Sequence, residues 1–250
     1  MPSSLTDPYL KTARAKEHLD DLRARLIKFR EEQPISFERN DDLANNVHTI
    51  RIKIKAIPDK VTLIAGDFLY CLRSSLDQLV WSLAKKDGEY PSGTQFPIFD
   101  YRDPNKFQRN TIGVPPQAVK LIECYQPYNA QNEVVMKEQL LWQLNKLCNI
   151  DKHRRIPTDA TIVDFRFPDF PRKFIQRANF DAETETVTMP LELKQYAKLD
   201  PTAYLNVTFG DSHEGIRCDA ARFEQMYEFV AHKLIPRFAT FFKKKIPATR

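Results

Sequence analysis

The chain is poor in glycine and has no long apolar run. Only six of its 250 residues are glycine, and neither GxGxxG nor GxxxxGK(S/T) occurs, which argues against a dinucleotide site or a P-loop. It has no run of about 18 apolar residues, and it does not start with the basic-then-apolar order of a signal peptide. The sequence therefore predicts a cytoplasmic protein without a membrane partner.

Cysteine and histidine show no spacing that is typical of a metal or catalytic site. The four cysteines show no CxxC spacing (Cys71, Cys124, Cys148 and Cys218), so they are better interpreted as small core residues than as disulfides or metal ligands. HExxH and GxSxG are also missing. We therefore expect no metal site and no cofactor. The formal net charge of +5 is compatible with a nucleic-acid partner but does not require one.

Apolar residues at helical spacing predict a largely helical chain. The expected helices span residues 7–33, 58–88, 117–124, 132–149 and 219–243, with a kink at Pro236. Residues 89–116, between the second and third of these helices, are rich in Pro, Gly, Asn and Asp. This composition predicts a long ordered loop.

Alternating apolar and polar residues predict two β regions. A hairpin is expected from residues 35–39 and 47–56, and short strands from 160–167, 173–180, 185–189 and 203–209. The predicted fold class is α+β, with a helical core and its inserted hairpin in residues 1–155. An antiparallel β layer and a long C-terminal helix follow in residues 156–250. We expect the two parts to pack as one compact domain.

A first polar cluster interrupts the apolar helix predicted over residues 58–88. Arg73 and Asp77 are four residues apart, and Tyr70, Ser74 and Trp81 follow the same line on the helix. Arg73 can therefore pair with Asp77 while its guanidinium reaches toward an anion. The alternative is a helix-surface ion pair, or a partly buried one, with a structural role only.

A second polar cluster follows the helix predicted over residues 132–149. It contains Asn149, Asp151, Lys152, His153 and Arg154. Histidine titrates near neutral pH and can act as a general acid or base, and arginine side chains can hold phosphate. The alternative is a surface histidine beside solvated basic residues. Two polar groups could thus converge on one site.

These motifs resemble a family of uncharacterised bacterial proteins. The shared elements are Leu-Arg-Ser-x-Leu-Asp at residues 72–77, a later Trp, Phe-Pro-Ile at 96–98, and Gln-Pro-Tyr at 126–128. Leu-Trp-x-Leu-x-x-Leu-x-Asn-x-Asp-Lys-His-Arg at 141–154 completes the pattern. The resemblance covers roughly residues 66–155. It implies a common architecture more than a reaction.

The chain is also similar to the HEPN superfamily of helical RNA-associated domains. RNase members of that superfamily carry an arginine and, four to six residues later, a histidine on one helix. The resemblance implies metal-independent RNA cleavage, often with two protomers at one cleft, and therefore a homodimer. Arg73 matches the arginine, but the histidine positions hold Gln78, Leu79 and Val80. None of these side chains can accept and return a proton at neutral pH, which places catalysis in doubt.

We therefore expect a HEPN-like protein that binds RNA or another phosphate-bearing ligand, within stress or phage defence. In this hypothesis Arg73, Asp77 and His153 are the catalytic residues: Arg73 holds the phosphate, Asp77 orients it, and His153 completes the site. The residues expected to contact the ligand are Tyr70, Ser74, Asn149, Asp151, Lys152 and Arg154.

Two alternatives do not need a catalytic site. In the first, the protein is a non-enzymatic binding or interaction module whose polar clusters are structural. In the second, a small-molecule pocket lies under the loop of residues 89–116, lined by Phe96, Phe99 and Trp81.

Overall fold

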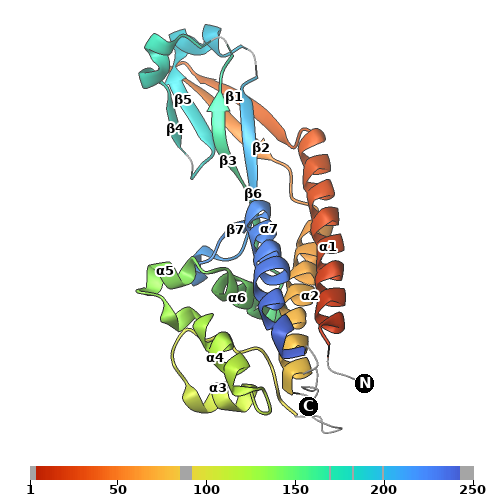
Figure 1. Cartoon of the computed structure of the whole chain (residues 1–250). Helices are drawn as coiled ribbons and strands as arrows, with labels where there is room; N and C mark the ends of the chain where they lie inside the picture. Colours follow the sequence, from red (N-terminus) through yellow and green to blue (C-terminus); the bar gives the residue numbers. More distant parts are fainter. Residues whose placement is uncertain (1–3, 85–91, 169, 182, 199, 243–250) are drawn as a thin grey trace, which may run out of the picture. The chain divides into compact units, whose positions relative to one another are not determined.

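The protein forms a mixed α+β structure that contains two compact units (Figure 1). The computed structural model describes residues 4–84, 92–168, 170–181, 183–198 and 200–242. Unit 1 consists of Met1–Arg23, Asp59–Pro157 and Phe209–Arg250, and unit 2 consists of Ala24–Pro58 and Thr158–Thr208. Within the described residues, no helix is long and apolar enough to cross a membrane.

Unit 1 is largely helical. Its long helices are α1 (Thr6–Glu31, whose last turns belong to unit 2), α2 (Asp59–Ala84) and α6 (Leu140–His153). Shorter ones are α3 (Pro104–Asn110), α4 (Pro116–Cys124), η1 (Pro127–Asn129), α5 (Glu133–Lys137), η4 (Ser212–Glu214) and α7 (Ala220–Glu228). The chain then continues through η5 (Phe229–Leu234) and η6 (Ile235–Phe242). The predicted helices over residues 7–33 and 117–124 are confirmed within two residues at each end.

Helix α2 is the centre of unit 1. Most of its residues are buried, and its buried leucines recur every three or four residues along one side of the helix. Leu63 and Tyr70 are exposed, so α2 buries a wide face and leaves a narrow stripe open to solvent. It packs against α6 and η6, and Phe68 stacks on Phe223 with ring centroids 5.3 Å apart. The prediction for residues 58–88 is confirmed as far as Ala84, and residues 85–88 lie outside the described residues.

Two predicted helices differ from the structure for identifiable reasons. The C-terminal segment is not one kinked helix: α7 changes to a π-helical turn, η5, and then to 3₁₀ geometry in η6. Pro236 has no N–H to donate to His232 in an α-helix, and Ile235 N instead bonds to Val230 O, five residues back. Residue 243, the predicted end, lies outside the described residues.

The helix predicted over residues 132–149 is two helices. Asn132 caps α5 by accepting a hydrogen bond from Val135 N at 2.9 Å. After α5 ends, Gln143 Nε2 donates to Lys137 O at 2.9 Å, so a side chain of α6 satisfies one of the free carbonyls at the α5 terminus.

Unit 2 is built on antiparallel strands. One sheet has the order β1 (Ile35–Asp42), β2 (Val47–Ile54), β5 (Thr186–Pro190) and β4 (Asn179–Asp181). Unit 2 also contains β3 (Thr158–Arg166) and β6 (Thr202–Phe209, whose last residue belongs to unit 1), and unit 1 contains the short strand β7 (Cys218–Asp219). The short turns η2 (Arg172–Arg177) and η3 (Leu191–Tyr196) complete the unit. The predicted β1–β2 hairpin is confirmed, with Ile35 opposite Ile54 and Asp42 opposite Val47.

The structure groups the β residues differently from the division expected at residues 155 and 156. Strand β2 pairs with β5, from Val47 opposite Pro190 to Arg51 opposite Thr186. The hairpin and the later strands therefore share one sheet and one apolar core (Ile50, Ile52, Val187, Met189, Leu193 and Ala197). The strand predicted over residues 173–180 is wrong in its first part, because Phe174 N bonds to Pro171 O in a 3₁₀ turn.

Candidate functional site

Arg73 and Asp77 hold the backbone of Phe96. Arg73 Nη1 donates to Asp77 Oδ1, and Arg73 Nη2 donates to the Phe96 carbonyl oxygen at 2.8 Å. Asp77 Oδ1 also accepts the Phe96 N–H at 2.9 Å. Phe96 is fully buried, and a buried backbone group without a partner costs about 1–3 kcal/mol. The ion pair thus supplies both hydrogen bonds that Phe96 needs. We call these three residues the clamp.

The three residues after Phe96 are held in the same way. Gln126, itself buried, donates from Nε2 to Pro97 O at 2.7 Å and accepts the Phe99 N–H at 3.3 Å. Asn145 Nδ2 donates to Ile98 O at 3.5 Å. The sequence motifs around Arg73, Phe96 and Gln126 therefore meet at one place, where polar side chains satisfy an irregular buried segment.

The clamp leaves Arg73 little access to solvent. Its side chain is only 11% exposed, and both Nη atoms donate to atoms of the protein. Gln78, where the HEPN resemblance would place a histidine, is half-buried, and its buried Oε1 has no hydrogen-bond partner among the described residues. Nearby on α2, Ser74 is half-buried. Tyr70 is exposed, with Lys11 Nζ 5.7 Å from its ring centroid.

Asp151 of α6 is exposed overall, but its carboxylate lies against Gly66 of α2. A Cβ atom at Gly66 would lie 2.6 Å from Asp151 Oδ1, so the carboxylate occupies space that only glycine leaves open. Burial raises the pKa of Asp151, and the neighbouring Asp67 carboxylate raises it further. The charged group that shifts the pKa of Asp151 is thus a second carboxylate.

Lys146 and the basic residues after the end of α6 form ion pairs. Arg154 Nη2 donates to Asp211 Oδ2 at 2.9 Å and also to Glu214, and Lys146 Nζ lies 2.7 Å from Glu214 Oε2. The pKa of Glu214 is lowered mainly by the hydrogen bond from Lys146. Arg155 pairs with Asp59 at 2.6 Å. Asn149, Lys152 and His153 are exposed at the same helix end.

Arg73 and His153 lie at different positions along the contact between α2 and α6. Asp151 of α6 lies against Gly66 of α2. Cys148, one turn earlier on α6, lies near Arg73: burial raises the pKa of the Cys148 thiol to about 12, and the positive charge of Arg73 opposes that rise. The two helices are therefore antiparallel. With a rise of 1.5 Å per residue in both helices, Arg73 and His153 are roughly 13 Å apart along the helix axes. Proton transfer requires hydrogen-bond reach or one water, so these contacts do not assemble the expected composite site.

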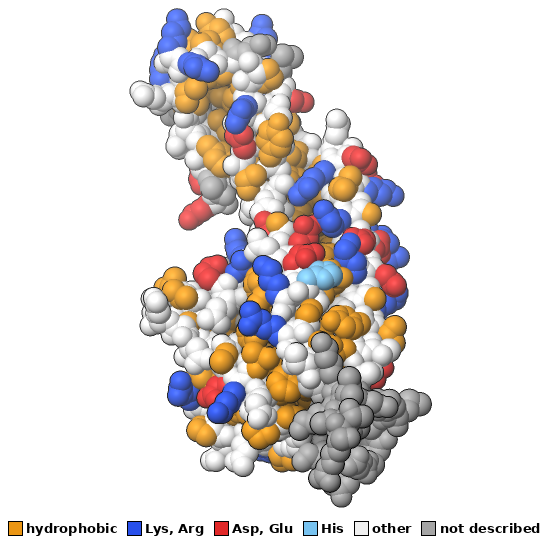
Figure 2. All heavy atoms as spheres, viewed as in Figure 1, with side chains coloured by type: hydrophobic (Ala, Val, Ile, Leu, Met, Phe, Trp, Pro, Cys, Tyr) orange, Lys and Arg blue, Asp and Glu red, His pale blue; other side chains and the backbone are white. Residues whose placement is uncertain are grey.

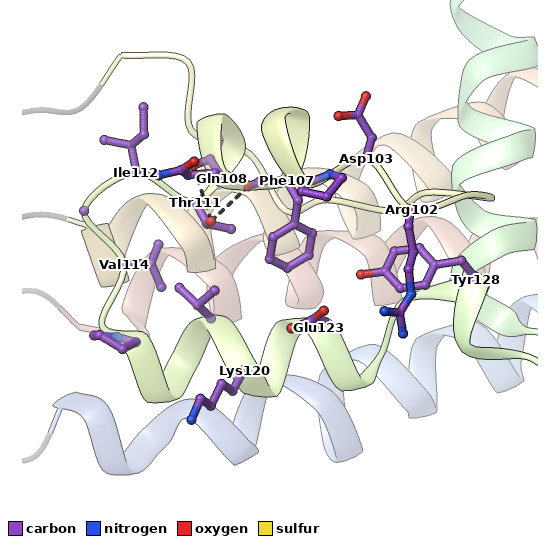
Figure 3. A pocket seen from close by; sticks show the side chains of 14 residues that line it. Arg102, Asp103, Phe107, Gln108, Thr111, Ile112, Val114, Lys120, Glu123 and Tyr128 are labelled. Carbon is purple, nitrogen blue, oxygen red and sulfur yellow. Dashed lines mark hydrogen bonds between the residues drawn. The ribbon is translucent and has the colours of Figure 1, made fainter.

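A cavity of about 670 Å³ lies between α3 and α4 (Figure 3). Phe107 points from α3 toward α4, and Val114 and Val119 add apolar surface. Thr111 Oγ1 donates to Phe107 O at 2.9 Å. One of the alternatives placed a small-molecule pocket under the loop of residues 89–116, and several residues of that loop between Arg102 and Val114 line this cavity. Phe96, Phe99 and Trp81 do not line it.

One end of this cavity is polar. The Arg102 guanidinium lies over the Tyr128 ring, 5.3 Å from its centroid, and Glu123 points from α4 toward Phe107. Burial raises the pKa of Tyr128, with a contribution from Glu123 and opposition from Arg102. Asp103 is occupied as the N-cap of α3, accepting from Lys106 N at 2.9 Å. The cavity thus combines apolar walls with a cation, a carboxylate and a hydroxyl.

His48 in unit 2 is a buried polar residue that sequence reasoning missed. It is 4% exposed, and its Nδ1 lies 2.6 Å from Asp41 Oδ1. Its Nε2 is buried without a hydrogen-bond partner. The strand pattern could have revealed this residue, because His48 shares the buried face of β2 with Ile50 and Ile52. Hairpin register then places Asp41 directly opposite.

Comparison with known proteins adds no family to this description. No family model, no curated protein and no solved structure matches the chain. Within the described residues, no group of three or more His, Cys, Asp or Glu side chains is arranged to hold a metal ion.

Proposed function

We propose that the protein is a non-enzymatic binding module that holds a small amphipathic molecule in the cavity between α3 and α4. The clamp is the observation that carries this proposal. Arg73 and Asp77 satisfy the backbone of buried Phe96, which favours a structural role for this cluster over chemistry. The segment that they anchor leads into α3, one wall of the cavity.

The cavity has the properties of a small-molecule site. Its volume of about 670 Å³ lies within the roughly 300–1,000 Å³ of typical ligand pockets. Apolar walls with a few convergent polar groups are usual in such sites, and the perturbed pKa of Tyr128 is a further indication. The apolar body of the ligand would lie against Phe107 and Val119, and its polar end would meet Arg102 and Tyr128.

Binding of anilinonaphthalene sulfonate, a fluorescent molecule with an apolar body and an anionic group, tests this proposal. We expect saturable fluorescence enhancement with the folded protein. Val119→Trp fills the cavity and should abolish it, whereas Val134→Trp makes the same change at an exposed residue of α5 and should preserve it. Equal binding by the two variants would contradict the proposal.

The polar end is tested with a matched pair of arginines. Arg102→Ala removes the guanidinium beside Tyr128, and we expect roughly tenfold weaker binding of the sulfonate, as for loss of one charge-assisted hydrogen bond. Arg109→Ala removes an exposed arginine of α3 that does not line the cavity and should leave binding unchanged.

RNA binding, a HEPN-like bundle, a homodimer and a role in defence are further proposals that rest on the sequence resemblance. The exposed Lys152 and His153 at the end of α6 would be accessible to RNA. Figure 2 shows Lys and Arg side chains interspersed with Asp and Glu over the helices of unit 1. Incubation with total RNA without metal tests the RNase, and cleavage that is lost in His153→Ala would support it.

A further inference from the structure

Unit 2 contains a second cavity, of about 620 Å³, beside the β1–β2 hairpin and η3. It is lined by Arg39, Asp41, His48, Lys194 and Lys198, together with neutral residues. The lining thus contains three cationic side chains and one carboxylate, and Arg39 is in addition paired with Asp200 at 2.6 Å. Both oxygens of the Asp41 carboxylate are already bonded, because Asp41 Oδ1 meets His48 Nδ1 at 2.6 Å and Asp41 Oδ2 accepts from Lys194 Nζ at 2.5 Å.

The buried imidazole of His48 lacks one hydrogen bond. Asp41 holds Nδ1 and fixes the orientation of the ring, while Nε2 is buried and unpartnered. Most buried polar atoms in proteins have a partner, and a buried donor or acceptor without one is unfavourable. Nε2 has almost no accessible surface in this conformation, so a ligand oxygen reaches it only after a shift of the ring. In the imidazolium form both ring nitrogens are donors, and Nε2 can then donate to that oxygen while Nδ1 still donates to Asp41.

The charge of the cavity selects an anion. Arg39 Nη2 also donates to Asp200 Oδ1 at 2.6 Å, so the cations of the lining exceed Asp41 and Asp200 together by one, with His48 counted as neutral. The pKa of Asp41 is held low by its bonds from Lys194 and His48. The exposed ammonium of Lys198 adds a flexible donor of the kind that binds phosphate as a point charge. The volume exceeds what inorganic phosphate alone would fill, which favours an organic phosphate.

We propose that this cavity binds the phosphate group of a small phosphate monoester, with His48 Nε2 and Lys198 Nζ as donors to the phosphate oxygens. Asp41 is a positioning residue in this site, since it orients His48 from the side opposite Nε2. The proposal is independent of the cavity between α3 and α4, because none of its residues belongs to unit 1.

Calorimetric titration with adenosine 5′-monophosphate, adenosine and inorganic phosphate tests the ligand class. We expect the nucleotide to bind roughly tenfold or more tightly than adenosine, the difference being the charge-assisted bonds to phosphate. Binding of inorganic phosphate as tight as that of the nucleotide would assign the site to free phosphate and overturn the monoester. Equal binding of adenosine and its monophosphate would overturn phosphate recognition itself.

Variants locate the binding. Lys198→Ala should weaken nucleotide binding roughly fivefold to tenfold, and Lys198→Arg should restore most of it. Lys173→Ala removes an exposed lysine of unit 2 that does not line this cavity and should have no effect. Equal losses in Lys198→Ala and Lys173→Ala would overturn the site.

The buried histidine is tested separately, since its replacement can affect folding. In wild-type protein, the His48 imidazole signals in ¹H–¹³C NMR spectra, assigned with His48→Gln, should shift on addition of the nucleotide. They should not shift with adenosine. Nucleotide binding that leaves these signals in place would remove His48 from the site.

Discussion

The clamp in unit 1 and the His48 pair in unit 2 have similar chemistry but different completeness. Each joins a mostly buried cationic or titratable side chain to a carboxylate. In the clamp, Arg73 and Asp77 also bond the N–H and C=O of Phe96, so the groups they bury are matched within the protein. His48 is bonded on one nitrogen only. The hydrogen bonds of the clamp are complete and account for its contribution to the stability of the fold, whereas we propose that a ligand supplies the bond that His48 lacks.

The largest effect is expected from breaking the clamp. Arg73→Ala leaves the Asp77 carboxylate without its cation and the buried Phe96 carbonyl without a donor, so the free energy of unfolding should fall by about 3–5 kcal/mol. Urea denaturation followed by circular dichroism measures this change. Arg109→Ala, at an exposed position, should change it by less than about 0.5 kcal/mol. A loss below about 1 kcal/mol at Arg73 would mean that the clamp is not structural.

A smaller and opposite effect is expected next to the clamp. Gln78 Oε1 is buried without a partner, so Gln78→Met, which removes that oxygen at similar volume, should raise the free energy of unfolding by about 1 kcal/mol. The same substitution at exposed Gln117 is the control. Destabilisation by Gln78→Met would show that this oxygen is satisfied in solution, and it would weaken the comparison with His48.

The smallest effect concerns Asp151. Its raised pKa means that folding disfavours its ionised form, so this group lowers stability as pH rises above the ordinary aspartate value of about 3.9. Asp151→Asn should therefore melt at a slightly higher temperature than wild type at pH 7. The difference should vanish at pH 3, where the carboxyl is protonated in both states. A pH-independent difference would assign the effect to packing against Gly66.

Local sequence patterns predicted the helices and strands of this fold better than they predicted which strands pair with one another. The helices over residues 7–33 and 117–124 and the β1–β2 hairpin follow from periodicity that is contained in each segment. The pairing of β2 with β5 joins residues far apart in sequence, and nothing in either strand specifies the other. The hairpin was therefore assigned to the helical part of the chain, although it belongs to the sheet of unit 2.

The candidate sites show the same limit. The sequence singled out Arg73 and Asp77 and offered a structural pair as one interpretation, but Phe96 as the group they hold could not be foreseen. The residue type at a position does not show which side chain bonds to its backbone. His48 was set aside because it has no metal-ligand spacing, whereas the useful signals were strand alternation and hairpin register.

The β2–β5 pairing also affects how the chain emerges from the ribosome. Arg51 and its partner Thr186 are 135 residues apart, and at typical synthesis rates β2 would wait on the order of ten seconds for β5. During that time one edge of the finished hairpin has unpaired N–H and C=O groups and an apolar face with Ile50 and Ile52. The nascent chain thus passes through an aggregation-prone interval, in which a ribosome-associated chaperone would have the most effect on the yield of native protein.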